Sequence, residues 1–331
     1  MSINITKADT SVALAGRTTD IEVVVPKAIE GKGPWTLAWR RLRKDRAAMI
    51  SLGSILFIVI LAILAPLVAT ITGHGNMQQF RTIGLSPSGQ PVAPSGTFWF
   101  GTDDLGRDLL VRIAYGARIS LFVGVVATAV TVIGGTVIGL AAGYFGKIVD
   151  TLLARFMDWL LAVPYLLFAL SLFSVVQVHP ILWVIGPGLP VVIVVLGFFG
   201  WAAVGRLVRG QVLSIKEKEY IEAARALGAG PWRIMFVDIL PNLLAPLIVY
   251  TTLLIPLTIV GEATLSFLGV GVQAPTADWG VMINGSSNVF LYGPWWYLVF
   301  PSAALLFTTL AFNIFGDGVR DAFDPRGDLN V

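Results

Sequence analysis

The chain of 331 residues contains no cysteine and only two histidines, His74 and His179. Without cysteine there is no disulfide framework, no thiolate nucleophile and no thiolate metal site. The phosphate-binding loop G-x-x-x-x-G-K-S/T is absent, and so are H-E-x-x-H and G-x-S-x-G. We therefore expect no catalytic residue, no metal site and no cofactor bound by this chain, and we interpret both histidines as loop residues.

Charged residues are also scarce, at 13% of the chain, whereas a soluble domain has about 25%. Hydrophobic residues make up 56%. They gather in runs of the ~20 residues that a membrane-spanning helix needs. The first run starts too far along the chain, and is too long, to be a secretory signal. The runs predict an all-α, polytopic membrane protein with six transmembrane helices, at 47–71, 117–143, 151–176, 189–208, 244–261 and 296–316.

The basic residues predict which side of the membrane each connection faces. If the N-terminus lies inside, all but four of the 23 Lys and Arg residues fall on the inner side. The positive-inside rule therefore predicts that both termini are cytoplasmic. We interpret the net charge of +3 as a result of this topology and not as a sign of nucleic-acid binding. The four outer bases are Arg81, Arg107, Arg112 and Arg118.

The spans divide the chain into three parts. Residues 1–46 are expected to form a cytoplasmic tail, in which 34–46 is either an interfacial amphipathic helix rich in Trp and Arg or a plain basic flank. Residues 47–316 form the transmembrane domain, including a cytoplasmic loop over 212–242. Residues 317–331 form a cytoplasmic C-terminal tail. Lipid is therefore one expected partner.

Few ionisable residues lie inside the spans. Arg155 and Asp158 are three residues apart, which favours a structural ion pair over a role in conduction. Glu262, at the outer end of the fifth span, is expected either to brace an outer gate or to be solvated at the interface. No acidic or histidine relay crosses the membrane and no internal repeat is found, which argues against an ion-coupled carrier.

Glycine spacing in the second span predicts close helix packing. Gly135, Gly139 and Gly143 lie one turn apart on one face, where another helix backbone can approach closely. The partner is either a helix of another subunit or a helix of the same bundle.

The loop over 212–242 is a charged segment between two apolar runs. Residues 215–227 predict a helix, and Gly-Ala-Gly-Pro at 228–231 breaks it. Large apolar residues near the membrane edge need burial, either in the cleft of a partner protein or on the chain's own bundle. The apolar positions are Tyr220, Ile221, Ala224 and Leu227 on the helix, and Trp232, Ile234, Met235 and Phe236 after it.

The same loop contains Glu222-Ala223-Ala224, then Gly228, then Leu240-Pro241, and this pattern resembles the EAA loop of ATP-binding-cassette (ABC) importer permeases. The resemblance extends over about residues 35–326 and implies the type I ABC importer permease fold. Other segments resemble the second (C-type) permease of dipeptide and oligopeptide importers: 100–108, 115–121, 265–271, 274–280 and 313–326.

The resemblance implies a non-catalytic subunit of a multi-pass complex in a bacterial or archaeal plasma (inner) membrane. A related B-type permease would pair with this chain. Two cytoplasmic ABC ATPase subunits would bind ATP and Mg, and an extracytoplasmic binding protein would deliver the substrate to the outer loops 73–118 or 264–293. By analogy, the residues that couple the chain to the ATPases are Glu222, Ala223, Ala224, Gly228, Pro231, Trp232, Leu240 and Pro241.

Several alternatives stay open at this stage. Importers of nickel, glutathione and oligosaccharides share these motifs with peptide importers, and an ion-coupled secondary carrier is the alternative from a different class. In the C-terminal tail, Asp317 and Arg320 are expected to form either a local salt-bridged lock or a second contact with an ATPase.

Overall fold

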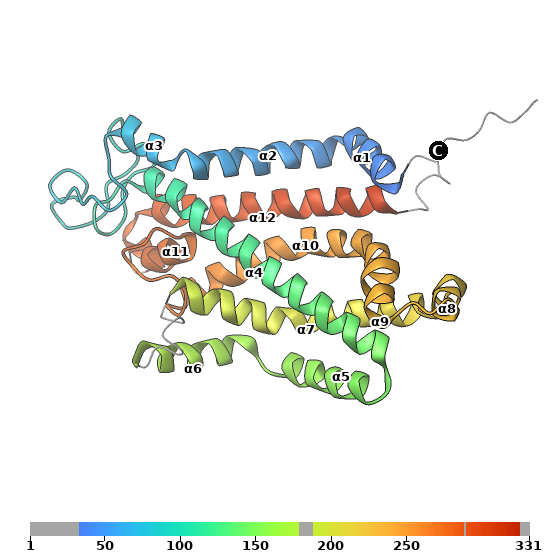
Figure 1. The fold of residues 1–331 in the computed structure, drawn as a ribbon. Helices are drawn as coiled ribbons and strands as arrows, with labels where there is room; N and C mark the ends of the chain where they lie inside the picture. Colours follow the sequence, from blue (N-terminus) through green and yellow to red (C-terminus); the bar gives the residue numbers. More distant parts are fainter. Residues whose placement is uncertain (1–32, 179–187, 288, 325–331) are drawn as a thin grey trace, which may run out of the picture. The chain divides into compact units, whose positions relative to one another are not determined.

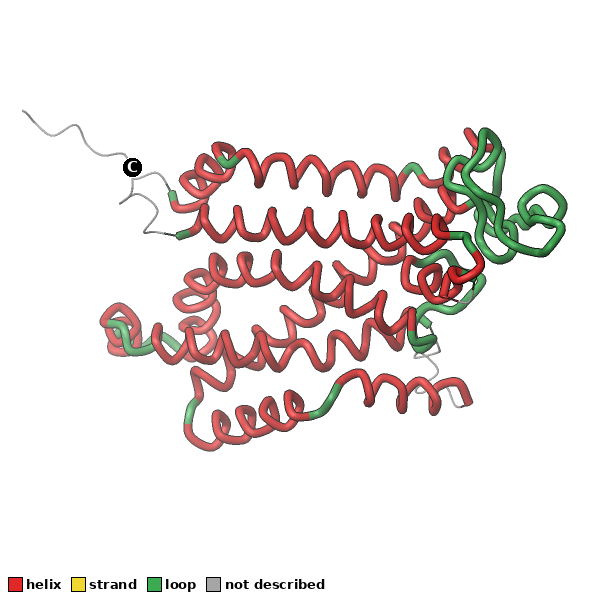
Figure 2. Tube along the Cα trace, turned by 180° about the vertical axis from the view of Figure 1, so that it is seen from behind, coloured by secondary structure: helices red, strands yellow, loops and turns green. Residues whose placement is uncertain are grey.

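The computed structural model describes residues 33–178, 188–287 and 289–324. In these residues the secondary structure is helical, with two isolated β-bridges and no strand (Figure 2). The all-α prediction is confirmed. Five helices are long and apolar enough to cross a membrane, and a bent pair of helices brings the total to six.

The elements follow the chain in the order labelled in Figure 1. They are α1 (Pro34–Lys44), α2 (Arg46–Ile63), α3 (Ala65–Thr72), α4 (Leu109–Phe145), α5 (Lys147–Ala162), α6 (Tyr165–Val178), α7 (Leu189–Ile215), α8 (Glu219–Ala226), α9 (Pro231–Arg233), the π-helix η1 (Ile234–Ile239), α10 (Leu240–Phe267), α11 (Trp279–Ser287), the 3-10 helix η2 (Phe290–Tyr292) and α12 (Trp295–Phe323).

The first span is preceded by a separate short helix. Residues expected at 34–46 form α1, which ends before Asp45. The Asp45 side chain accepts hydrogen bonds from the backbone N–H groups of Ala47 and Ala48, and so caps the start of α2. On α1, Ala38 and Leu42 are buried against α12, whereas Trp35 and Trp39 are about half exposed.

The third span is broken, not continuous. We expected one run over 151–176, but the chain forms α5 and α6 on either side of Pro164, and their axes differ by 82°. Val163 is extended, with φ −81° and ψ 124°. A residue before proline is driven out of the helical region by the proline ring, which explains why the helix stops there.

Helices α4 and α7 pack at close range through the glycine face. A Cβ on Gly139 would lie 2.6 Å from the Gly205 carbonyl oxygen, and one on Gly143 would lie 2.6 Å from Val212 Cβ. Gly135 is equally crowded by Val204. Of the two partners left open for these glycines, the structure shows a helix of the same bundle.

The polar segments lie at two opposite ends of the helices. Figures 1 and 2 show residues 73–108 and α11 at one end, called the loop end below. They show α1, α8 and the last turn of α12 at the other, called the α8 end.

Candidate functional site

The loop predicted over 212–242 forms a compact protrusion at the α8 end (Figure 1). Our prediction of one helix over 215–227 is wrong. Helix α7 ends at Ile215, Lys218 is extended (φ −82°, ψ 143°), and α8 begins at Glu219. The Lys216 ammonium donates to the Gly143 carbonyl oxygen at 3.1 Å and so fastens the end of α7 to α4.

A small set of contacts holds α8 to the bundle. Ile221 is completely buried in a cluster with Val212, Ile234 and Ile239. The Asn242 side-chain amide donates to the Tyr220 hydroxyl at 3.3 Å and to the Asp238 carbonyl oxygen at 2.7 Å. The first bond connects α8 to the start of α10, and the second connects η1 to the start of α10.

Gly228 makes the turn after α8 possible. Its φ is +83°, in the left-handed region that favours glycine. Its N–H donates to the Arg225 carbonyl oxygen at 2.9 Å, and the next N–H donates to the Ala224 carbonyl oxygen at 3.0 Å. Together they close the C-terminal end of α8.

The apolar surface expected after the turn is divided between two sides. Ile234 and Met235 are buried, whereas Trp232 is 70% exposed and stacks on Phe236 with ring centroids 5.8 Å apart. Leu227, expected on the buried stripe, is 89% exposed. Of the remaining predicted coupling residues, Glu222, Ala223, Gly228, Pro231 and Pro241 are exposed, and Ala224 and Leu240 are half-buried. The protrusion therefore presents carboxylate, small and aromatic groups outward.

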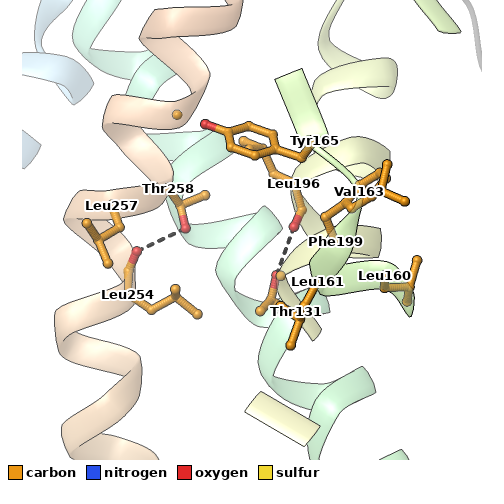
Figure 3. Close-up of a pocket in the computed structure, with 12 residues that line it drawn as sticks. Thr131, Leu160, Leu161, Val163, Tyr165, Leu196, Phe199, Leu254, Leu257 and Thr258 are labelled. Carbon is orange, nitrogen blue, oxygen red and sulfur yellow. Dashed lines mark hydrogen bonds between the residues drawn. The ribbon is translucent and has the colours of Figure 1, made fainter. Parts of the chain in front are cut away.

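A second feature is a cavity of about 280 Å³ beside the break between α5 and α6. Its lining residues come from α4, α5, α6, α7 and α10 and from Val163 in the break, and Figure 3 shows their side chains gathered around it. The lining is mostly apolar, with hydroxyl groups on Thr131, Tyr165 and Thr258. Thr258 donates to the Leu254 carbonyl oxygen at 2.9 Å and Thr131 to the Leu196 carbonyl oxygen at 3.4 Å. The sequence motifs did not indicate this cavity, although Pro164 marks its position.

The predicted pair of Arg155 and Asp158 does not form. Asp158 instead pairs with Arg206 of α7, and Asp150 with Arg209 of the same helix. Among the described residues Arg155 makes no ion pair. Because α7 packs directly against α5, its arginines reach these carboxylates from the side, which spacing along α5 alone cannot reveal.

The predicted pair of Asp317 and Arg320 is also wrong, since no ion pair joins these residues in the described part of α12. Both side chains are exposed, where water competes for each charge. A different bond fixes this end of α12: Arg41 Nη1 of α1 donates to the Asp324 carbonyl oxygen at 2.8 Å.

At the loop end, Glu262 is completely buried, so the alternative of a solvated interface residue is wrong. Ser266 Oγ donates to Glu262 Oε1 at 2.8 Å, and the Asp278 carboxyl group lies close enough to interact with that of Glu262. Ser120 Oγ of α4 donates to Asp278 Oδ1 at 3.1 Å. Sequence reasoning missed Asp278 and Ser120, which lie far from Glu262 along the chain.

The loop end also has a buried charged cluster, formed by Asp103 and Arg107 of the loop and Arg112 of α4. Asp103 Oδ2 lies 2.6 Å from Arg107 Nε and 3.2 Å from Arg112 Nε. Nearby, His74 Nδ1 lies 2.6 Å from Asp108 Oδ2. His74 is thus a buried structural residue, whereas His179 lies outside the described residues.

Comparison with known proteins agrees with this membrane bundle. Residues 135–328 match the binding-protein-dependent transport system inner membrane component family. Residues 33–87 match the N-terminal transmembrane domain of oligopeptide transport permease C. The class is therefore that of membrane-embedded transport components. Within it, the chain belongs to the dipeptide/oligopeptide ABC permeases of the C type.

Two relatives from Bacillus subtilis (strain 168) cover most of the chain. The dipeptide transport system permease protein DppC is 43% identical over 289 residues, which are 87% of this chain and 85% of the relative. The oligopeptide transport system permease protein OppC is 39% identical over 292 residues, which are 88% and 90% of the two chains.

A solved structure of the MetNI methionine ABC transporter in an inward-facing conformation supports the fold alone. One of its chains is 19% identical with a TM-score of 0.52, over 64% of this chain and 96% of that chain. The predicted ABC permease fold is confirmed.

Proposed function

We propose that this chain is the C-type permease subunit of an ATP-driven importer of dipeptides or oligopeptides. It pairs with a B-type permease, docks on two cytoplasmic ABC ATPase subunits and receives substrate from an extracytoplasmic binding protein. The names of the relatives, which are dipeptide and oligopeptide transport permeases, support peptide as the substrate class. The complex lies in the inner membrane, with both termini of this chain in the cytoplasm.

The observation that carries this proposal is the exposed protrusion at the α8 end. Glu222 and Trp232 face away from the bundle, although a tryptophan is costly to leave in water. Aromatic residues of this kind are enriched at the centres of protein interfaces. We therefore assign this surface to the ATPase, and the ATPase moves it when ATP binds and is hydrolysed.

The contacts of α8 provide a route for that movement into the membrane. The bond between Tyr220 and Asn242 leads to α10, and Lys216 connects the end of α7 to α4. Helices α4, α7 and α10 line the cavity of Figure 3. We assign this cavity to the wall of the translocation path, because a mostly apolar lining with a few hydroxyl groups tolerates varied peptide side chains.

Reconstitution with the B-type permease, the ATPases and the binding protein tests the proposal. Glu222→Lys and Gly228→Pro should leave the complex inserted and able to hydrolyse ATP, while uptake of a labelled dipeptide falls by at least about tenfold. Glu217→Lys, an equal charge change on an exposed neighbour, is the control and should transport normally. Normal uptake in both test variants would refute the coupling role.

Competition distinguishes the substrate classes. An excess of unlabelled dipeptide should abolish uptake, while nickel ions, glutathione and an oligosaccharide should not. If one of those three competes instead, the chain is a permease of the same architecture with a different substrate. Uptake by the purified chain alone, driven by an ion gradient, would instead support the hypothesis of an ion-coupled secondary carrier.

A further inference from the structure

Two carboxyl groups meet inside the protein at the loop end. Glu262 belongs to α10, and Asp278 immediately precedes α11. Both residues are 0% exposed. Each carboxyl group lies close enough to act on the charge of the other, so that a proton on one of them removes the repulsion between two negative charges.

Each hydrogen bond that the two carboxyl groups accept comes from a neutral donor. Ser266 Oγ donates to Glu262 Oε1, and Ser120 Oγ donates to Asp278 Oδ1. The Val281 backbone N–H donates to Asp278 Oδ2 at 3.0 Å. Glu262 Oε2 has no hydrogen-bond partner. This buried oxygen is free to carry a proton.

The cationic side chains of the neighbouring helices, and the Tyr297 hydroxyl, interact with groups other than Glu262 and Asp278. On α4, Arg112 pairs with Asp103, and Arg118 lies over the Tyr115 ring at 5.7 Å. On α7, Arg206 and Arg209 pair with the carboxylates of α5. On α12, Tyr297 donates to Asp104. Within the described residues, no Lys, Arg or His forms an ion pair with Glu262 or Asp278.

Two neighbouring carboxyl groups that are buried and lack a countercharge cannot both be ionised. Burial raises the pKa of the Asp278 carboxyl above its ordinary value of 3.8. We propose that Glu262 and Asp278 together form a proton-binding site, in which one shared proton fastens α11 to α10 and α4. The site goes beyond the proposed transport role, which assigns it no function.

The surroundings of α11 explain why losing this proton has structural consequences. A Cβ on Gly280 would lie 2.3 Å from the Ala263 carbonyl oxygen, so α11 and α10 are in backbone contact. Trp279 Nε1 donates to the Ile113 carbonyl oxygen at 3.1 Å. Two negative charges at this contact repel one another. Movement of α11 away from α10 relieves this repulsion.

The sign of the pH dependence follows from linkage. Because the folded protein holds the proton more tightly than the unfolded chain, the site stabilises α11 at low pH. This stabilisation starts to fall above the ordinary carboxyl pKa and is lost as the pH rises through the pKa of the folded site.

Infrared spectroscopy of the full chain in lipid tests the proposal directly. At about pH 7, the wild type should show the carbonyl-stretch band of a protonated carboxyl group. Glu262→Gln should remove this band, because the glutamine amide donates a hydrogen bond to Asp278. Asp278 then stays ionised, and no protonated carboxyl group remains at the site. Asp278→Asn should shift the band, since Glu262 stays neutral. Glu219→Gln, on the exposed face of α8, is the control and should leave the band unchanged.

Hydrogen exchange supplies a second measurement. From about pH 6 to about pH 9, after correction for intrinsic exchange, protection of the α11 amides should fall in the wild type and stay constant in Glu262→Gln. A wild-type spectrum without the band, or equal pH slopes in the two proteins, would overturn the proposal. The wild-type and Asp278→Asn spectra remain decisive if Glu262→Gln does not fold.

Discussion

The loop end and the α8 end of this permease treat charged residues in opposite ways. At the loop end, Asp103, Arg107 and Arg112 are at most 5% exposed and serve as partners for one another. At the α8 end, Glu222, Arg225 and Trp232 are all exposed. The buried charges of the loop end are therefore compensated within this chain, whereas the charged groups of the α8 end are exposed to solvent.

The largest expected effect is at the loop end. Asp103→Ala removes the carboxylate that compensates Arg107 and Arg112, and it should lower the free energy of unfolding by about 3–5 kcal/mol. Thermal unfolding of the purified chain in detergent measures this loss of stability. Asp104→Ala is the matched control, because this side chain is 39% exposed, and it should cost about 1 kcal/mol. Equal losses in the two variants would contradict the assignment of a buried charge cluster.

Trp232→Ala tests the open face of the α8 end. We expect the free energy of unfolding to change by no more than about 0.5 kcal/mol, since the side chain is 70% exposed. Binding of the ATPase subunits should weaken by about 30-fold, as expected for an aromatic residue at an interface centre.

A tryptophan at the loop end serves as the control. Trp99 is 56% exposed, and Trp99→Ala should leave ATPase binding unchanged in the same titration. If both variants bind the ATPases as tightly as the wild type, the α8 end is not the docking surface.

Gly228→Ala separates backbone shape from surface chemistry at the α8 end. A Cβ at this position meets nothing within 4 Å, so the cost of roughly 1 kcal/mol comes only from the left-handed backbone. Gly230 is equally open but has φ −73°, and Gly230→Ala should be neutral or slightly stabilising. The melting temperatures of the two variants, each compared with that of the wild type, measure this difference. Identical shifts would mean that the turn does not require a positive φ.

The smallest effect is expected at the ion pairs between α5 and α7. The side chains of Asp158 and Arg206 are 51% and 54% exposed, so Asp158→Asn should cost less than about 1 kcal/mol. Asp150→Asn should cost more, because Asp150 is 18% exposed and accepts two hydrogen bonds from Arg209. Thermal unfolding of both variants gives the order, and the reverse order would show that exposure does not set the strength of these pairs.

Much of the bundle could be predicted from the sequence because its causes are local. Long apolar runs gave the spans, and the spacing of Gly135, Gly139 and Gly143 gave a close helix contact. Glycine at 228 and proline at 231 predicted the turn in the protruding loop. Each of these depends on the backbone preferences or the hydropathy of neighbouring residues.

The remaining features depend on which helices become neighbours. Arg206 replaced Arg155 as the partner of Asp158 because α7 packs on α5. The sequence left open whether Glu262 braces a gate or is solvated at the interface, and only the packing of α10 shows that it is buried near Asp278. The cavity beside Pro164 combines residues from five helices. Periodicity along one helix cannot identify such contacts, since they depend on tertiary packing.

The close packing of α4 on α7 has a mechanical consequence. Gly139 and Gly205 bring the two backbones so near that neither helix can slide along the other without a collision. Helix α4 begins directly after the loop over 73–108, and α7 leads within a few residues to α8. Under the proposed coupling role, a force on the protruding segment would therefore move both helices as one unit, and the displacement would reach the loop end.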